Sequence, residues 1–318
     1  MTITVQKTIE DALAAAVPER PGLGLLGWIH GRDIRPAYHG LPVTSPASVE
    51  EFAAAWQAQL AAMPPASLTV PAGQFARGPA PLLEQRIAEL QATDQYRAQY
   101  QPFGAAFATV SIAELITPQW WTDSAYVGEL TAVLPAEDDL PGLFDFCFPE
   151  GQLAPPMMLG TVGAAFTSSR HNLGAISALR VAQHSPGKTT FQFDVTPRAN
   201  WVWLAAVACL PRPMILNGVH HLLALLKAGR TEALCLMCTM QTPHDLQALG
   251  MNYQDPFLFK PDQLMSARPP LLRDYLDSAM AVPVGRHASD QYLRLVLNSE
   301  IGVVPRGRQD GALAHTSG

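Results

Sequence analysis

Two adjacent histidines, His220 and His221, follow the pair Asn217-Gly218 in the stretch MILNGVHHLLALLKAG, residues 214–229. A glycine has no Cβ, so its backbone can approach a ligand closely or adopt a positive φ. Backbone N–H groups at the start of a helix can hold an anion, and an imidazole beside them can add a hydrogen bond or transfer a proton. We therefore predict a ligand-binding site at these four residues, with His220 as the candidate catalytic residue.

The two histidines are not equivalent if a helix begins here. Successive residues of a helix point about 100° apart, so at most one of the two side chains faces a ligand at the turn. The alternative interpretation is that one histidine caps the helix while its neighbour packs partly buried. The sequence favours His220 over His221 for contact with a ligand, and leaves both interpretations open.

The residues around this pair predict a strand, a tight turn and a helix. Residues 214–216 form a short apolar run that is typical of the end of a buried strand. From Val219 onward the apolar residues recur at the spacing of one helix face. Gly229 is suited to end the helix, and Lys227 suits the negative end of the helix dipole.

Two further apolar runs complete the expected unit. Residues 201–210 (WVWLAAVACL) indicate a central strand that turns back through a Pro-Arg-Pro sequence, and residues 233–240 (ALCLMCTM) indicate another buried strand. The segment 201–240 is therefore predicted to form a hairpin, a helix that starts within two residues of Gly218, and a strand.

Cys235 and Cys238 have the CxxC spacing that is found in zinc and redox sites. They fall in the predicted strand 233–240, where residues three apart point to opposite faces, so both cannot bind one metal ion. No second CxxC is present to complete a ligand set. We predict buried, reduced thiols here and no metal site.

The remaining pattern predicts an α/β or α+β fold, with a mixed sheet around residues 107–240 and helical additions at both ends. In the helix expected over residues 48–63, the apolar stripe consists of Val49, Phe52, Trp56 and Leu60. Further helices are predicted over residues 82–100, 270–279 and 289–298. The chain divides into an N-terminal accessory segment (1–75), a core with an insertion (76–250) and a C-terminal helical extension and tail (251–318).

Charge and composition exclude some classes of function. The 318 residues carry 21 basic and 27 acidic side chains, a formal net charge of −6. Because the basic residues form no block, we expect no broad nucleic-acid surface. The first twenty residues do not have the pattern of a secretion signal, and no apolar run reaches membrane-spanning length. A soluble, cytoplasmic protein that makes no contact with membranes is expected.

The turn and its neighbours resemble the ParB/sulfiredoxin superfamily. The matching residues are Asn217, Gly218, His220, Ala224, Leu225 and Gly229, together with an upstream strand and loop over residues 110–121. The resemblance covers at best residues 107–240, with a long insertion between its halves. It implies a Gly turn that holds nucleotide phosphates. Members of the superfamily hydrolyse CTP, phosphorylate free serine, or activate a sulfinic acid with ATP.

The chain departs from that superfamily at two positions. His221 stands where the family has an arginine, which removes a permanently charged, bidentate phosphate contact. Val219 stands where the sulfiredoxin nucleophile would fall, so that chemistry is absent.

Two functions from different classes follow from these residues. The first is a protein that binds a small ligand, a nucleotide or another phosphorylated compound, with phosphoryl transfer or nucleotide hydrolysis as the expected reaction class and a nucleotide with Mg²⁺ as the candidate cofactor. The second is a non-catalytic interaction or scaffold protein that retains the fold and binds a protein partner.

Overall fold

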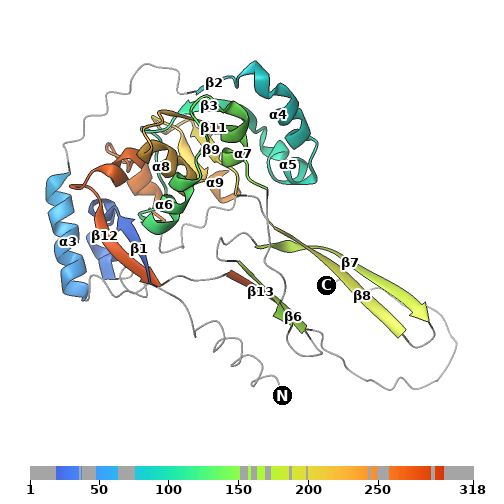
Figure 1. Ribbon diagram of the computed structural model, residues 1–318. Coiled ribbons are helices and arrows are strands. Elements are labelled where there is room, and N and C mark those ends of the chain that lie inside the picture. Colours follow the sequence, from blue (N-terminus) through green and yellow to red (C-terminus); the bar gives the residue numbers. More distant parts are fainter. Residues whose placement is uncertain are drawn as a thin grey trace.

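The computed structural model of the 318-residue chain contains helices and strands in two main sheets and an inserted, strand-rich arm (Figure 1). It describes residues 19–35, 37, 48–63, 76–150, 157–158, 163–168, 173–185, 188–197, 200–242, 245–248, 258–287 and 291–296.

The larger sheet has five strands in the order β10-β9-β11-β3-β2. Strand β11 runs parallel to β9, while the other neighbouring pairs are antiparallel. The sheet is therefore mixed, and the predicted α/β class with a mixed sheet around residues 107–240 is confirmed. Its strands are β2 (Ala76–Arg77), β3 (Ala106–Ser111), β9 (Trp203–Val207), β10 (Met214–Asn217) and β11 (Glu232–Met240).

The prediction for residues 201–240 is confirmed in each of its parts. Strands β9 and β10 form an antiparallel hairpin. Helix α8 (Val219–Lys227) begins at the residue after Gly218, and β11 follows it. The apolar runs become strands because β9 and β11 lie inside the sheet, where both faces need apolar side chains. Gly229 has a φ of 81° after the end of α8, as expected for a glycine that terminates a helix.

A second sheet joins segments that are far apart in the sequence. It has the order β12-β1-β4, with both neighbouring pairs antiparallel. Strand β1 (Glu19–Gly24) comes from the N-terminal segment, β4 (Trp121–Asp123) from the middle, and β12 (Val282–His287) from the C-terminal segment. The parts of the chain before residue 76 and after residue 250 therefore pair with each other and with the core segment between them.

Helix α8 lies between the two sheets. It contacts β11 of the larger sheet and β4 of the smaller one, together with helix α6 (Ser124–Ala132) and the 3-10 helix η5 (Leu272–Leu276). Four successive residues, Leu222 to Leu225, are almost completely buried. A helix that is apolar on nearly all sides is expected only where packing surrounds it.

The insertion between the two halves of the core forms strands. Strands β5 (Met157–Met158) and β6 (Gly163–Ser168) make a small sheet with β13 (Gln291–Val296). Strands β7 (Leu173–Ser185) and β8 (Lys188–Pro197) form a long hairpin that extends away from the body of the molecule (Figure 1).

Three predictions about helices need correction. The prediction of a helix over residues 289–298 is wrong, because residues 291–296 form strand β13, which pairs antiparallel with β6. The helix expected over 270–279 is reduced to η5. The single helix expected over 82–100 is divided into α4 (Glu84–Gln91) and α5 (Asp94–Gln99), because the hydroxyl of Thr93 accepts a hydrogen bond from the Tyr96 amide and begins a new helix. The described residues after 258 are thus only partly helical.

Helix α3 (Val49–Ala62) packs differently from its predicted apolar stripe. Its first turn is capped as expected, with the Ser48 hydroxyl accepting a hydrogen bond from the Glu51 amide. Phe52 is fully buried, whereas Leu60 is 47% exposed and the neighbouring Gln59 is buried. The Gln59 side-chain oxygen accepts from the Gly27 amide at 3.0 Å, and its nitrogen donates to the Gly24 carbonyl at 3.3 Å. Gln59 therefore supplies the polar partners that the chain leaving β1 requires.

Replacing Gln59 with leucine tests this role. We expect Gln59→Leu to lower the free energy of unfolding by about 2 to 3 kcal/mol, because two buried backbone groups lose their partners. Urea denaturation provides the measurement. Gln57→Leu on the exposed side of the same helix is the matched control and should change stability little; equal effects of the two substitutions would contradict the assignment.

Candidate functional site

The turn between β10 and α8 is held in a conformation that suits glycine alone. Gly218 has φ 93° and ψ 17°, in the left-handed region, and forms the N-cap of α8. A Cβ added to Gly218 would lie 3.0 Å from both the Cα and the Cγ2 of Val202. Gly218 is itself buried, and Asn217 beside it ends β10 half-buried. The glycine is thus explained by close packing of the turn against the backbone before β9.

His220 connects the beginning of α8 to the beginning of α6. Its Nε2 accepts a hydrogen bond from the Asp123 backbone N–H at 3.2 Å. Asp123 is the N-cap of α6, and its carboxylate accepts from the Tyr126 amide at 2.9 Å. The rings of Tyr126 and His220 lie 5.4 Å apart. Because Nε2 is the acceptor, the His220 ring is neutral in this arrangement and carries its proton on Nδ1.

His221 points in a different direction, into the interior. It is 6% exposed, and its ring lies 5.2 Å from that of Phe146 in an edge-to-face arrangement. Phe146 belongs to helix α7 (Leu140–Cys147). The structure therefore brings Asn217, Gly218 and His220 together at the turn, and it places His221 in contact with another helix.

Asp123, Tyr126 and Phe146 were not identified from the sequence as neighbours of the turn. Asp123 carries a local signal that could have been used, since an aspartate directly before a short apolar-periodic segment is a typical N-cap. No local signal connects α6 or α7 to α8, because these contacts join distant parts of the chain.

The described part of the chain has a small pocket that is separate from the turn. Its lining combines the apolar Ile29, Trp120 and Phe259 with the charged Asp33 and Lys260. None of the residues of the β10–α8 turn belongs to it. The residues that the sequence singles out for ligand binding thus do not line this pocket.

The four cysteines are free thiols, with Cys209 exposed and the other three buried. Burial raises the pKa of Cys147 to about 12 and also raises the pKa of Cys235 and of Cys238. These buried thiols are poor nucleophiles, since the thiolate is the reactive form. Within the described ranges, no group of three or more His, Cys, Asp or Glu residues is arranged to hold a metal ion.

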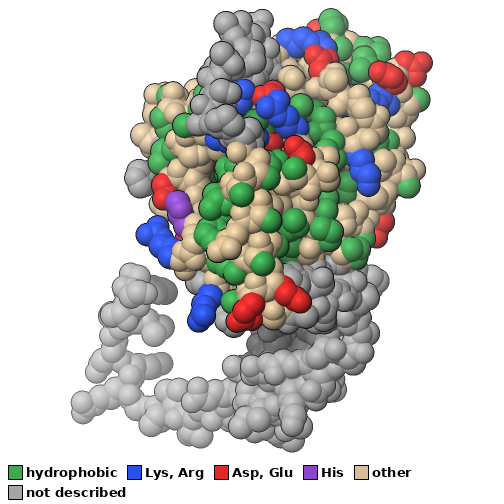
Figure 2. Space-filling view, turned by 90° about the vertical axis from the view of Figure 1, so that its left-hand side faces the viewer, with side chains coloured by type: hydrophobic (Ala, Val, Ile, Leu, Met, Phe, Trp, Pro, Cys, Tyr) green, Lys and Arg blue, Asp and Glu red, His purple; other side chains and the backbone are tan. Residues whose placement is uncertain are grey.

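Charges of both signs are interspersed on the surface shown in Figure 2, where Lys and Arg side chains lie beside Asp and Glu with hydrophobic side chains between them. Among the helices that the structure describes, none has the length and apolar character needed to span a membrane.

Comparison with known proteins adds no relative to this picture. No family model matches the chain, and neither the search of curated proteins nor the search of solved structures returned a match. The resemblance to the ParB/sulfiredoxin superfamily therefore stays a prediction from residues 107–240.

Substitution of Gly218 separates strain in the backbone from crowding against Val202. Gly218→Ala should lower the free energy of unfolding by about 2 to 4 kcal/mol, because it adds a close contact to the cost of a positive φ. Gly229→Ala is the matched control: Gly229 also has a positive φ, but nothing lies within 4 Å of an added Cβ. Its cost should be only about 1 kcal/mol. Chemical denaturation of both variants gives the comparison, and equal losses would exclude the Val202 contact as a cause.

Proposed function

We propose that this chain is a non-catalytic interaction protein that retains an α/β core as a scaffold. The observation that carries this proposal is the use of both histidines of the turn in internal contacts. His220 binds the first residues of α6, and His221 packs against α7. Residues that the superfamily resemblance would assign to a ligand thus hold three helices together.

The position of His221 is the stronger part of this argument. The resemblance puts His221 where a phosphate-binding arginine would stand. A ring that is 6% exposed and packed on Phe146 has little reach toward a ligand at the turn. Since a histidine also lacks the permanent charge and fork geometry of arginine, the usual phosphate contact has no substitute at this position.

The β7–β8 hairpin is the element that fits contact with a partner. Its strands pair only with each other among the described residues, so each has a backbone edge open to another strand. The 13 residues of β7 give it a length of about 40 Å at the usual rise per residue. A two-stranded hairpin is marginally stable alone, and addition of a strand to an open edge is a common mode of recognition.

A second copy of this chain is the partner that we propose. An antiparallel strand pair has two-fold symmetry, so a strand edge is complementary to the same edge of another copy. The register sets Leu179 opposite Phe193 and Val181 opposite Phe191, so apolar pairs occupy alternate positions of the hairpin, with Arg180 opposite Gln192 between them. The cytoplasm is the compartment that we propose, because buried reduced thiols fit a reducing environment.

Binding of a nucleotide or another phosphorylated compound at the turn is the second candidate. It is favoured by the meeting of two helix N-termini, those of α6 and α8, through the bond between His220 and Asp123. Both ends carry partial positive charge that attracts an anion. In this alternative, ligand binding replaces or adds to the internal hydrogen bond of His220, with phosphoryl transfer or nucleotide hydrolysis as the reaction class.

A nucleotide panel combined with His220 variants distinguishes the two functions. We expect ATP, CTP and GTP, with or without Mg²⁺, to leave the melting temperature of the wild-type protein unchanged. His220→Ala should lower the free energy of unfolding by about 1 to 3 kcal/mol, because the backbone N–H of the buried Asp123 loses its hydrogen-bond acceptor. His220→Gln, whose amide oxygen can accept, should recover part of this loss.

His30→Ala is the control for the loss of a histidine, since His30 pairs with Asp262 at the surface and should contribute about 0 to 1 kcal/mol. The scaffold proposal fails if a nucleotide raises the melting temperature of the wild type and His220→Ala removes that rise without loss of stability.

Shortening the hairpin tests the proposed contact between copies. Replacement of residues 174–196 by a short Gly-Ser linker should shift the melting temperature of the body by no more than about 3 °C, because the hairpin extends away from it. Sedimentation velocity should show a dimer for the full chain and a monomer for the shortened one. Equal masses for the two proteins would rule out pairing through this hairpin.

A further inference from the structure

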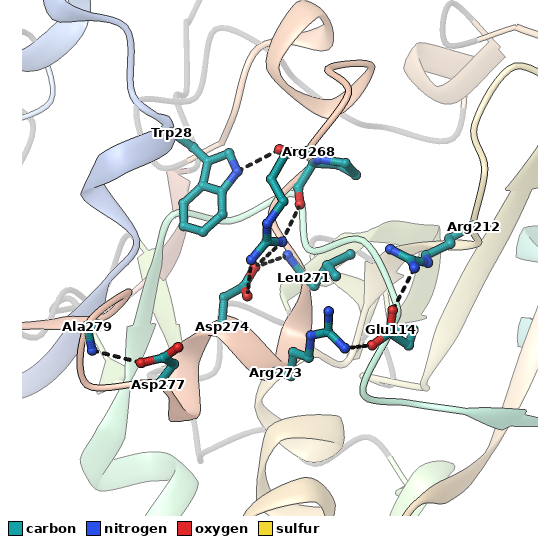
Figure 3. Close-up of polar contacts among 10 residues, drawn as sticks. Trp28, Glu114, Arg212, Arg268, Leu271, Arg273, Asp274, Asp277 and Ala279 are labelled. Carbon is teal, nitrogen blue, oxygen red and sulfur yellow. Dashed lines mark hydrogen bonds and ion pairs between the residues drawn. The ribbon is translucent and has the colours of Figure 1, made fainter. Parts of the chain in front are cut away.

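A group of five charged residues lies at the opposite end of β10 from the turn (Figure 3). The segment 112–117 runs between β10 and residues 270–273, with Ile116 bridged to Met214 on one side and to Leu271 on the other. This arrangement brings together side chains from three separate parts of the chain. They form the arginine cluster, which consists of Glu114, Arg212, Arg268, Arg273 and Asp274.

Arg268 and Asp274 form an ion pair in which two hydrogen bonds join the two side chains. Arg268 donates two hydrogen bonds to the Asp274 carboxylate, at 2.9 and 3.3 Å, and its guanidinium lies 5.4 Å from the centre of the Trp28 ring. The Leu271 amide donates to the same carboxylate at 2.7 Å. Asp274 is thus committed to Arg268 and to the local backbone.

Arg212 is not satisfied in the same way. Its side chain is 4% exposed, and its Nη2 lies 2.8 Å from Glu114 Oε2. Its Nε and Nη1 are buried and have no hydrogen-bond partner in the described structure. Unpaired N–H groups of a buried charge are costly, and native proteins nearly always supply them with an acceptor.

The arginine cluster also contains more positive than negative side chains. Glu114 is shared, since its other oxygen binds Arg273. Among the described residues of the cluster, three arginines therefore face two carboxylates, one fewer than one-to-one pairing requires. Burial lowers the pKa of Arg212, the nearby Arg268 lowers it further, and Asp274 raises it. Arg212 is the member of the cluster whose charge is least compensated.

We propose that the arginine cluster is a binding site for an oxyanion, either a phosphate or a carboxylate group, that supplies the missing acceptor to Arg212. Arg273 provides the entrance because its side chain is 51% exposed and is joined to the cluster only through Glu114 among the described contacts. Displacement of Arg273 from Glu114 gives an anion access to the enclosed Arg212. An oxyanion matches the planar donors of guanidinium, and charge-assisted bonds of this kind are among the strongest hydrogen bonds in proteins. This site is independent of the proposed scaffold function.

Calorimetric titration with inorganic phosphate and, separately, with acetate tests the site at constant ionic strength. We expect at least one of the two to bind the wild-type protein and to raise its melting temperature. Arg212→Met should weaken that binding at least about tenfold, because a charged donor is removed. Arg97→Met is the matched control, since Arg97 forms a surface pair with Asp94, and it should bind as the wild type does.

Glu114→Gln is a second variant, for which we expect tighter rather than weaker anion binding. Its result can be interpreted even if Arg212→Met does not fold. Removing the carboxylate that competes for Arg212 and Arg273 should tighten anion binding about tenfold. Preference for phosphate or for acetate identifies the kind of oxyanion, and either supports the site. The proposal is overturned if neither anion binds, if Arg212→Met binds as the wild type does, or if Glu114→Gln leaves the affinity unchanged.

Discussion

The close approach of Gly218 to Val202 constrains most of the architecture. Helix α8 is enclosed between two sheets, and its central residues are almost completely buried. If the helix began at a different residue, these buried side chains would be displaced. The left-handed conformation of Gly218 fixes that position directly after β10. The contacts of His220 with α6 and of His221 with α7 then follow from the direction in which α8 leaves the turn.

Local patterns were sufficient to predict the unit that surrounds this turn. The apolar runs of β9, β10 and β11 and the glycines at both ends of α8 are signals contained within a few residues, so residues 201–240 could be predicted in order. The partners of the two histidines could not be predicted in the same way. Asp123, the N-cap of α6, and Phe146, in α7, are far away in the sequence, and their contacts depend on how α6 and α7 pack.

The errors arose where a local pattern was compatible with two structures. Residues 291–296 (QYLRLV) contain apolar residues at intervals that fit a helix as well as a strand, and pairing with β6 decides between them. In α3 the expected stripe included Leu60, but the hydrogen-bonding needs of Gly24 and Gly27 place Gln59 inside instead. The arginine cluster was missed because Glu114, Arg212 and Arg273 are brought together only by the tertiary fold.

The pairing of β1 with β12 also affects the order in which the protein can fold during synthesis. Strand β1 is made more than 250 residues before β12, the strand with which it forms its longer pairing, and β12 is among the last described strands to be made. The five-stranded sheet can form before then, but the edge of β1 that pairs with β12 stays open until residues 282–287 have emerged. Contacts between distant segments slow folding, and an open strand edge favours aggregation. Protection of this edge by a chaperone would therefore matter most for a nascent chain that has not reached residue 282.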